Sequence, residues 1–317
     1  MRKYILLIPV LKCVCFVAFG QKLMTYRPRV SEVTVSSIGN YSAMGPDGLT
    51  TRIQTDRLWQ YRFGIPLVLR EKTLFGVQLK HTELAYQTLS LSGTNEPLYE
   101  KLDEGKLFNT GINLLYQRTL ENSKQLILIG VSELASNEFS LNRFAGRHYI
   151  SGMLTRKPNE RVRWGYGGVV NYALGVWNVY PTLLYHKQLR DKWLLELNLP
   201  GNAQLRFHPD NKTHIIAKLA FDNWRYNVTD ALQDGSGQFT LQRADIYGGL
   251  MLEKQLYDWL WLAGEVSYLS NLSFFVAEPG ERLRNAVEEF KVDDSTQLKF
   301  SLFLVPPQKL WSGIKAR

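Results

Sequence analysis

Cysteine is scarce in this chain, which has 2 among its 317 residues. Both, Cys13 and Cys15, lie in an N-terminal segment that we expect to be removed, so the mature protein is expected to contain none. Small exported domains are commonly stapled by disulfides, so an exported chain without them must be held together in another way. A closed β-barrel meets that requirement, because closure leaves no unpaired strand edge.

Long apolar runs are also missing. Beyond the N-terminal segment there is no window of about 18 uninterrupted apolar residues, which excludes a protein built from membrane-spanning helices. Disorder is excluded as well, since 45% of the residues are hydrophobic and 12% are aromatic. The length leaves one or two domains open, because large all-β barrels run past about 200 residues as one domain.

The N-terminus has the features of a secretory signal peptide. Basic residues within the first three positions precede an apolar stretch, Tyr4–Phe19, that is interrupted only by Lys12. Small residues in Ala18–Gly20 suit a cleavage site directly before Gln21. We therefore expect the protein to be exported, with cleavage near Gly20.

Two alternatives to a cleaved signal are less favoured. A membrane anchor is opposed by Lys12, which splits an already short apolar stretch, and lipid attachment at either cysteine lacks the small preceding residue that a lipoprotein signal needs. We expect a signal peptide at residues 1–20, a barrel at 21–305 and a C-terminal tail at 306–317. Cleavage also removes three of the positive charges behind the formal net charge of +9, so the basic excess is modest.

Apolar and polar residues alternate with period two through much of the mature chain, as in strands with one apolar and one polar face. From Trp59 to Leu69 every odd position is apolar, while Gln60, Arg62 and Gly64 lie between them. The same alternation recurs in four other segments: Ile112–Tyr116, Trp164–Tyr172, Ala244–Leu252 and Leu298–Leu304.

Strand length and turn asymmetry distinguish a membrane barrel from a soluble sandwich. A strand that crosses hydrocarbon needs about 9 to 11 tilted residues, whereas ordinary strands have about 5 or 6. Long strands are predicted at residues 51–69, 73–91, 212–227, 237–255 and 259–276. Short turns are predicted at 70–72, 120–123, 157–160, 190–191, 209–211 and 257–258, and longer loops at 39–50, 92–104, 136–146, 228–236 and 277–291. This asymmetry is typical of an outer-membrane barrel with its short turns in the periplasm.

The predicted number of strands is 12 or 14. A first strand is expected at Arg29–Ile38 and a last one at Asp294–Val305, and the doubtful stretch is Trp193–His208, where a Pro-Gly pair separates two short runs. Both totals are even and bring both ends of the barrel to the periplasmic side. Pro66 and Pro181 are expected near the rims, because a closed barrel has no edge strand for proline.

Aromatic residues near the strand ends suggest the girdles that flank the apolar belt of a membrane barrel. The alternative is that they are ordinary core residues. The candidates are Trp59, Tyr61, Trp164, Trp193, Tyr257, Trp259 and Trp261.

The whole mature chain resembles an uncharacterised (DUF-type) outer-membrane β-barrel family of Bacteroidota. The resemblance rests on the signal peptide ending before Gln21, on the segment Trp259–Glu265, and on Lys192–Pro200 leading to Asp210–Lys212. It implies the location and the fold, with outer-membrane lipid and the barrel-assembly machinery as partners, and it supplies no catalytic residues. One departure is the tail at 306–317, since many such barrels end on an aromatic residue of the last strand; Phe300–Leu304 is the segment here that could serve instead.

Motifs for catalysis or metal binding are few. The five histidines (His81, His148, His186, His208 and His214) show no metal-ligand spacing, so we expect no metal and no cofactor. A lipid-acting barrel enzyme would need a histidine beside a serine, and the nearest candidates, His148 and Ser151, should face opposite sides of a strand. The glycines in Gly165–Gly168 lie inside an alternating strand and suit a barrel wall better than a phosphate loop.

The remaining place for function is the lumen. The polar faces contribute nine candidates, Arg62, Lys80, Arg163, Lys218, Asp222, Arg243, Asp245, Glu253 and Glu265. Unpaired cations would line an anion-preferring aqueous path, whereas paired ones would fill the interior with salt bridges. The loop segment Glu281–Phe290 is either a short helix over the mouth or an exposed charged loop.

The sequence thus predicts an all-β protein, a transmembrane antiparallel barrel of 12 to 14 strands in the bacterial outer membrane. We expect a channel or porin-like transporter for a small solute, not an enzyme, with no nucleic-acid partner. The alternatives are a non-conducting barrel that scaffolds a partner and, less favoured, a barrel enzyme that acts on lipid.

Overall fold

The structure is a computed structural model that describes residues 29–70, 72–91, 96–138, 144–229 and 237–305. The expected signal peptide and C-terminal tail lie outside these residues and stay predictions. Apart from one helix, α2 (Glu96–Glu104), and a 3-10 turn, η1 (Leu283–Asn285), the described elements are strands. No described helix has the length and apolar character needed to cross a membrane.

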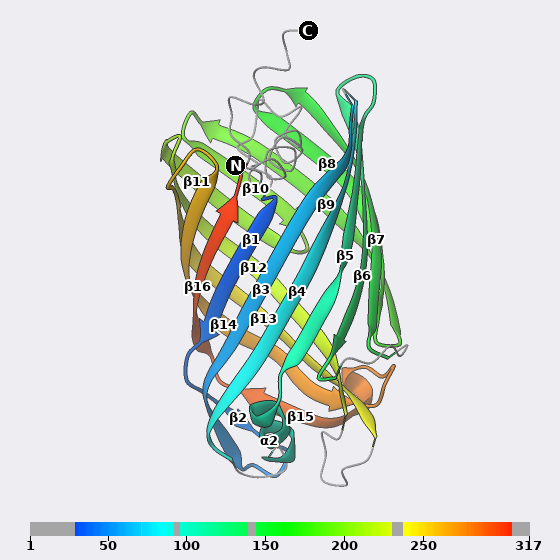
Figure 1. Ribbon diagram of the computed structural model, residues 1–317, viewed down its shortest axis with the longest axis vertical. Coiled ribbons are helices and arrows are strands. Elements are labelled where there is room, and N and C mark those ends of the chain that lie inside the picture. The colour runs from blue at the N-terminus through cyan, green and yellow to red at the C-terminus, as the bar shows by residue number, and fades with distance from the viewer. Residues whose placement is uncertain (1–28, 71, 92–95, 139–143, 230–236, 306–317) are drawn as a thin grey trace, which may run out of the picture.

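Fourteen strands form one closed antiparallel ring (Figure 1). In ring order they are β1 (Ser31–Ile38), β3 (Thr50–Arg70), β4 (Thr73–Ser90), β5 (Leu107–Thr119), β6 (Lys124–Ser136), β7 (Gly146–Asn159), β8 (Val162–Ala173), β9 (Val176–Arg190), β10 (Trp193–Leu199), β11 (Asn202–Asp210), β12 (Thr213–Thr229), β13 (Gln238–Gln255), β14 (Leu260–Ala277) and β16 (Ser295–Leu304). The ring closes where β1 pairs with both β16 and β3.

The doubtful stretch at Trp193–His208 forms two wall strands, which settles the alternative of 12 or 14 in favour of 14. β10 pairs with β9 and β11, and β11 pairs with β12. With 7 and 9 residues, β10 and β11 are shorter than most strands of the ring, so each shows only a short run of alternating residues in the sequence.

The two ends of the barrel differ, as the turn lengths predicted. At one end, called here the turn end, short turns join β3 to β4, β5 to β6, β7 to β8, β9 to β10, β11 to β12 and β13 to β14. The other end, the loop end, carries most of the long connections, although tight turns join β8 to β9 and β10 to β11 there. The described chain enters and leaves at the turn end, since Ser31 lies opposite Leu304.

The ring continues beyond β1 and β16 through two further strands at the loop end. β2 (Tyr41–Met44) pairs with the start of β3, and β15 (Ala286–Val292) pairs with the end of β14 and with β2. The wall between β14 and β3 is therefore completed by β16 and β1 in one part and by β15 and β2 in the other. Neither alternative for Glu281–Phe290, a short helix or an exposed charged loop, describes the whole segment: it contains the short 3-10 turn η1, and from Ala286 onward it forms β15 with its alternating burial.

The two faces of the wall agree with the period-two pattern. Leu250 is 58% exposed on the outer face of β13, and Ile112 of β5 and Phe300 of β16 are exposed in the same way. Tyr247 faces the lumen, where its ring lies 4.9 Å from the Lys218 Nζ atom. Apolar side chains thus point outward around the barrel, as the hydrocarbon of a membrane requires.

Six of the seven predicted girdle aromatics are exposed on the outside of the wall, with exposures from 37% for Trp164 to 68% for Tyr257. Trp261 is the exception and follows the alternative of a core aromatic. It is 3% exposed inside the barrel, where its ring stacks on Phe303. The alternation of buried and exposed side chains along β14 places Trp261 on the lumen side, and the 6.4 Å distance between the ring centroids of Trp261 and the buried Phe303 agrees with this.

Candidate functional site

The lumen is the candidate site, and its middle section combines ion pairs with water-exposed charge. The Lys80 Nζ atom lies 2.8 Å from the Glu133 carboxylate, and Lys218 Nζ lies 3.3 Å from that of Glu265. Asn109 donates a further hydrogen bond to Glu133 at 3.0 Å. These predicted lumen cations are therefore paired, which favours the salt-bridged alternative at their positions.

Two of the predicted lumen residues remain exposed to solvent inside the barrel. The Arg62 side chain is 39% exposed, and its Nη1 atom lies 3.7 Å from the Glu32 carboxylate. Asp222 is exposed on the lumen face of β12, where it lies opposite Asp245 in the register. The middle of the lumen is thus wet and carries charge of both signs.

Arg163 lies on the lumen face of β8, and in the hydrogen bonds described it donates to neutral side chains. Its Nη2 atom donates to Gln125 Oε1 at 2.6 Å and to Thr155 Oγ1 at 3.3 Å. Arg163 is half-buried at the turn end of the wall and so contributes charge there, away from the mouth.

A network of ion pairs spans the lumen at the turn end. Glu253, predicted to face the lumen, accepts from Arg29 at 2.8 Å and from Arg206 at 3.3 Å. Arg206 also donates to Glu196 at 2.9 Å, and Arg29 pairs with Glu32. The network links side chains of β1, β10, β11 and β13 across the interior.

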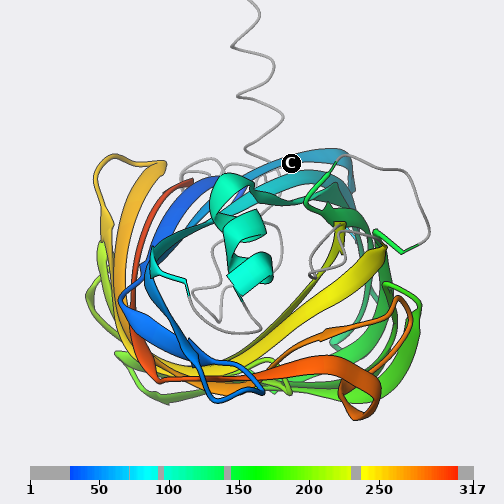
Figure 2. The same cartoon turned by 90° about the horizontal axis from the view of Figure 1, so that it is seen from below.

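The loop end is closed by an apolar plug that sequence reasoning missed. Leu98, Tyr99 and Leu102 of α2 are at most 2% exposed, because the helix lies within the mouth of the barrel (Figure 2). They pack in one cluster with apolar side chains of the wall, among them Tyr86 and Phe274. Burial raises the pKa of the Tyr99 hydroxyl, which keeps this group neutral inside the plug.

A buried ion cluster lies against this plug. Arg243, only 1% exposed, donates to Asp56 at 3.1 Å and to Asp245 at 2.9 Å. The Tyr41 hydroxyl donates to the same Asp56 carboxylate at 2.7 Å, and Asn271 donates to Asp245 at 2.8 Å. Arg243 and Asp245 therefore belong to the plug and do not line a water-filled path.

The β12–β13 hairpin also helps to close the mouth. The tip of β12 leaves the wall and pairs in parallel with β6, Asn227 lying opposite Ser136. In the ring β12 and β6 are separated by β7 to β11, so the hairpin crosses the mouth from one side of the wall to the other (Figure 2). The β12 tip thus lies between α2 on one side and β8 on the other.

The histidine–serine pair considered for a lipid-acting enzyme is not assembled. His148 lies on the outer face of β7, where its Nδ1 atom is 3.0 Å from the Ser132 Oγ atom of β6, whereas Ser151 lies opposite the buried Val169 on the lumen face. Among the described residues no group of three or more His, Cys, Asp or Glu side chains is placed to hold a metal ion.

The sequence matches one family model. A model described as Domain of unknown function (DUF6268) covers residues 54–258, more than half of the chain. The chain belongs to this family. The DUF6268 match includes Lys192–Pro200, one of the segments that suggested an uncharacterised barrel family, whereas Trp259–Glu265 lies just beyond it. The bacterial group expected from the sequence stays a prediction.

Solved structures similar to this DUF6268 chain are barrels of the outer-membrane type. The toluene transporter TodX of Pseudomonas putida is 10% identical, with a TM-score of 0.38, covering 89% of this chain and 91% of that one. A FadL homologue of Pseudomonas aeruginosa is 12% identical, with a TM-score of 0.42, covering 89% and 90%. The translocator domain of the autotransporter NalP from Neisseria meningitidis is 8% identical, with a TM-score of 0.32, covering 87% and 89%. These likenesses concern the barrel fold alone, and no curated protein matches the chain.

Several charged lumen residues of the DUF6268 barrel were not found from its sequence. Glu133 follows the run Leu126–Val131, which is apolar at both parities and so hides which face is the lumen. Glu196 and Arg206 lie in the stretch whose strands were in doubt. The signal that could have identified Glu196 is its parity: Leu194, Glu196 and Asn198 share one face of β10, and two of these three side chains are polar.

Proposed function

We propose that the protein is a gated outer-membrane channel for a small solute, closed in the present conformation. The observation that carries the proposal is the contrast between the wet, charged middle of the lumen and the apolar plug above it. Arg62 and Asp222 face water inside the barrel, whereas Leu98 and Tyr99 are completely buried in the mouth. A barrel with a purely structural role has no need for a hydrated interior behind a separate stopper.

The plug is built in a way that suits gating. It consists of α2, which lies in the connection between β4 and β5, and of the tip of β12, which extends beyond its pairing with β11. Moving α2 out of the mouth would leave the fourteen-strand ring and its hydrogen bonds in place. We therefore expect the closed and open states to differ at the loop end, and the turn-end ion network to restrict the width of the path.

Two substitutions in α2 test the proposal, each introducing glutamine. Leu98→Gln places a polar amide in the apolar cluster, at a cost of about 2–5 kcal/mol for lost packing and an unsatisfied polar group. Glu100→Gln, the matched control, changes an exposed position of the same helix. In planar bilayers the refolded wild type and the Glu100→Gln variant should open rarely, and Leu98→Gln should open much more often, in discrete steps.

The possible results separate the hypotheses. Equal, frequent conductance in all three proteins would mean an open pore in which α2 is no gate. Silence in all three, with each protein running as a heat-modifiable folded barrel on gels, would contradict the channel proposal. The scaffold alternative, supported by the extensive ion pairing at the turn end, would then take its place.

A further inference from the structure

A buried arginine, Arg225, lies between the β12 tip and β8. Along the β12 tip, Trp224, Tyr226 and Val228 face the α2 plug, so Arg225 between them faces the opposite side, toward β7, β8 and β9. Its Nη1 atom donates to the Ala173 carbonyl at 3.4 Å. Its Nη2 atom donates to the Glu281 carbonyl, in the β14–β15 loop, at 2.8 Å.

Arg225 has no counter-charge among the described residues. It is 6% exposed, its Nη atoms donate to the two carbonyl oxygens, and its buried Nε atom has no hydrogen-bond partner among the described residues. A buried guanidinium without an anion is costly, so such groups are ordinarily paired with a carboxylate or a phosphate. The free Nε–H marks a place where an acceptor is missing.

Two more arginines add positive charge at the same place. Arg147 lies directly opposite Ala173 in the register, and Arg282 follows Glu281 and donates to the Trp177 carbonyl at 2.8 Å. Both act electrostatically on Arg225. Neither forms an ion pair with an acid in the part of the chain that the structure describes.

Two acids near these arginines are shared with other partners. Glu133, opposite Arg147 on the wall, interacts with Arg147 but is also held by Lys80 at 2.8 Å and by Asn109 at 3.0 Å. The Glu281 carboxylate accepts from the Asn285 amide at 2.6 Å. Among the described residues, positive charge is therefore in excess around Arg225.

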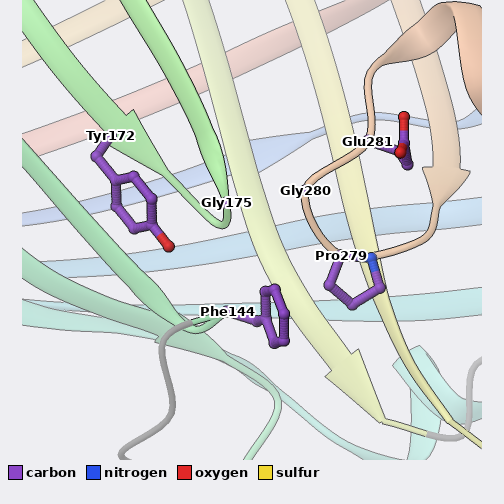
Figure 3. Close-up of a pocket in the computed structure, with 6 residues that line it drawn as sticks. All are labelled: Phe144, Tyr172, Gly175, Pro279, Gly280 and Glu281. Carbon is purple, nitrogen blue, oxygen red and sulfur yellow. The ribbon is translucent and has the colours of Figure 1, made fainter.

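A pocket of about 360 Å³ adjoins this cluster between the β8–β9 turn and the β14–β15 loop. Tyr172 lines it from β8 and Phe144 from the turn before β7, and Pro279 and Glu281 line it from the β14–β15 loop (Figure 3). Gly175 and Gly280 allow the two segments to meet, because a Cβ atom on Gly175 would lie 2.6 Å from the Gly280 Cα atom. Arg225 binds the backbone of the pocket lining through Glu281.

We infer that Arg225, Arg147 and Arg282 bind a phosphate group at the loop end, between the β12 tip, β8 and the β14–β15 loop, next to this pocket. Guanidinium groups present paired donors that match phosphate oxygens, and three of them suit a dianion better than a singly charged carboxylate. The group could belong to free phosphate or a phosphorylated solute, or to a phosphomonoester headgroup of a lipid at the rim. The chemistry is the same, and the experiment separates the two sources.

The test measures thermal unfolding of the refolded protein in a phosphate-free zwitterionic detergent at pH 8. Inorganic phosphate is titrated against chloride at equal ionic strength, with wild type, Arg225→Gln, Arg147→Gln and the control Arg161→Gln, which changes an exposed arginine at the turn end. Phosphate should raise the melting temperature of wild type and control. Its apparent Kd should be at least about tenfold weaker in the other two variants, the effect of losing a hydrogen bond between charged groups.

A second arm places the same proteins in phosphatidylcholine nanodiscs with or without phosphatidic acid. Stabilisation by inorganic phosphate identifies a soluble anion, and stabilisation by phosphatidic acid alone identifies a lipid headgroup. In ligand-free buffer Arg225→Gln should unfold at the same or a higher temperature than wild type, because it removes an uncompensated charge; this also shows that the variant folds. A wild type that responds in neither arm, or a response equal in all four proteins, would overturn the inference.

Discussion

Replacing Arg243 by methionine should loosen the plug. The substitution leaves Asp56 and Asp245, which are 2% and 3% exposed, without their cation. Removing one partner of a buried ion pair costs about 3–5 kcal/mol, because the remaining charge is not compensated. At about 1.4 kcal/mol per power of ten, local opening of the plug should increase roughly 100- to 4,000-fold.

Hydrogen–deuterium exchange measures this opening directly. Amides in residues 50–56 of β3 and 238–245 of β13 should exchange faster in Arg243→Met by the factor above, while the turn-end half of β13 should keep wild-type protection. Adding Asp56→Asn and Asp245→Asn to Arg243→Met should restore most of the protection, since no charge is then left buried. Wild-type protection in Arg243→Met would refute the assignment of this cluster to the plug.

Two further predictions concern the membrane. Leu250→Arg should impair barrel assembly, because an arginine on the lipid face costs up to about 2–4 kcal/mol, whereas Gln60→Arg on the lumen face should assemble normally; equal yields of heat-modifiable barrel would show that the faces are misassigned. The mature protein should begin at Gln21 and fractionate with the outer membrane, which N-terminal sequencing of the membrane fraction checks, and an intact Met1 or recovery in the soluble periplasm would contradict this.

The wall of the barrel could be predicted from the sequence because its rule is local. A side chain's face depends only on parity, so the alternation predicted for Ala244–Leu252 is enough to put Leu250 on the outer face and Tyr247 on the lumen face, where the structure has them. Parity fails where the wall is interrupted or where both faces are apolar. Trp261 was assigned to the wrong face for this reason, since apolar residues precede and follow it.

The plug could not be predicted, because its contacts depend on chain segments that are distant in sequence. Arg243 was identified as a lumen residue, but its partner Asp56 is 187 positions away, and no local pattern connects them. The α2 segment has the composition of an ordinary polar loop, and only its packing against Tyr86 and Phe274 shows that it lies inside the barrel. The position of Arg225 likewise depends on the β12 tip leaving the wall.

The crossing of the mouth by the β12–β13 hairpin has a mechanical consequence. A closed barrel can be flattened without breaking the pairing of its wall strands, but a cross-link through its interior resists flattening. The backbone pairing of Asn227 with Ser136 is such a cross-link at the loop end, and the hydrogen bonds between Asn137 and the β12 tip reinforce it. Lateral pressure from the bilayer should therefore deform the barrel at the turn end, where the described residues bridge the interior through side chains, and leave the cross-section of the mouth unchanged.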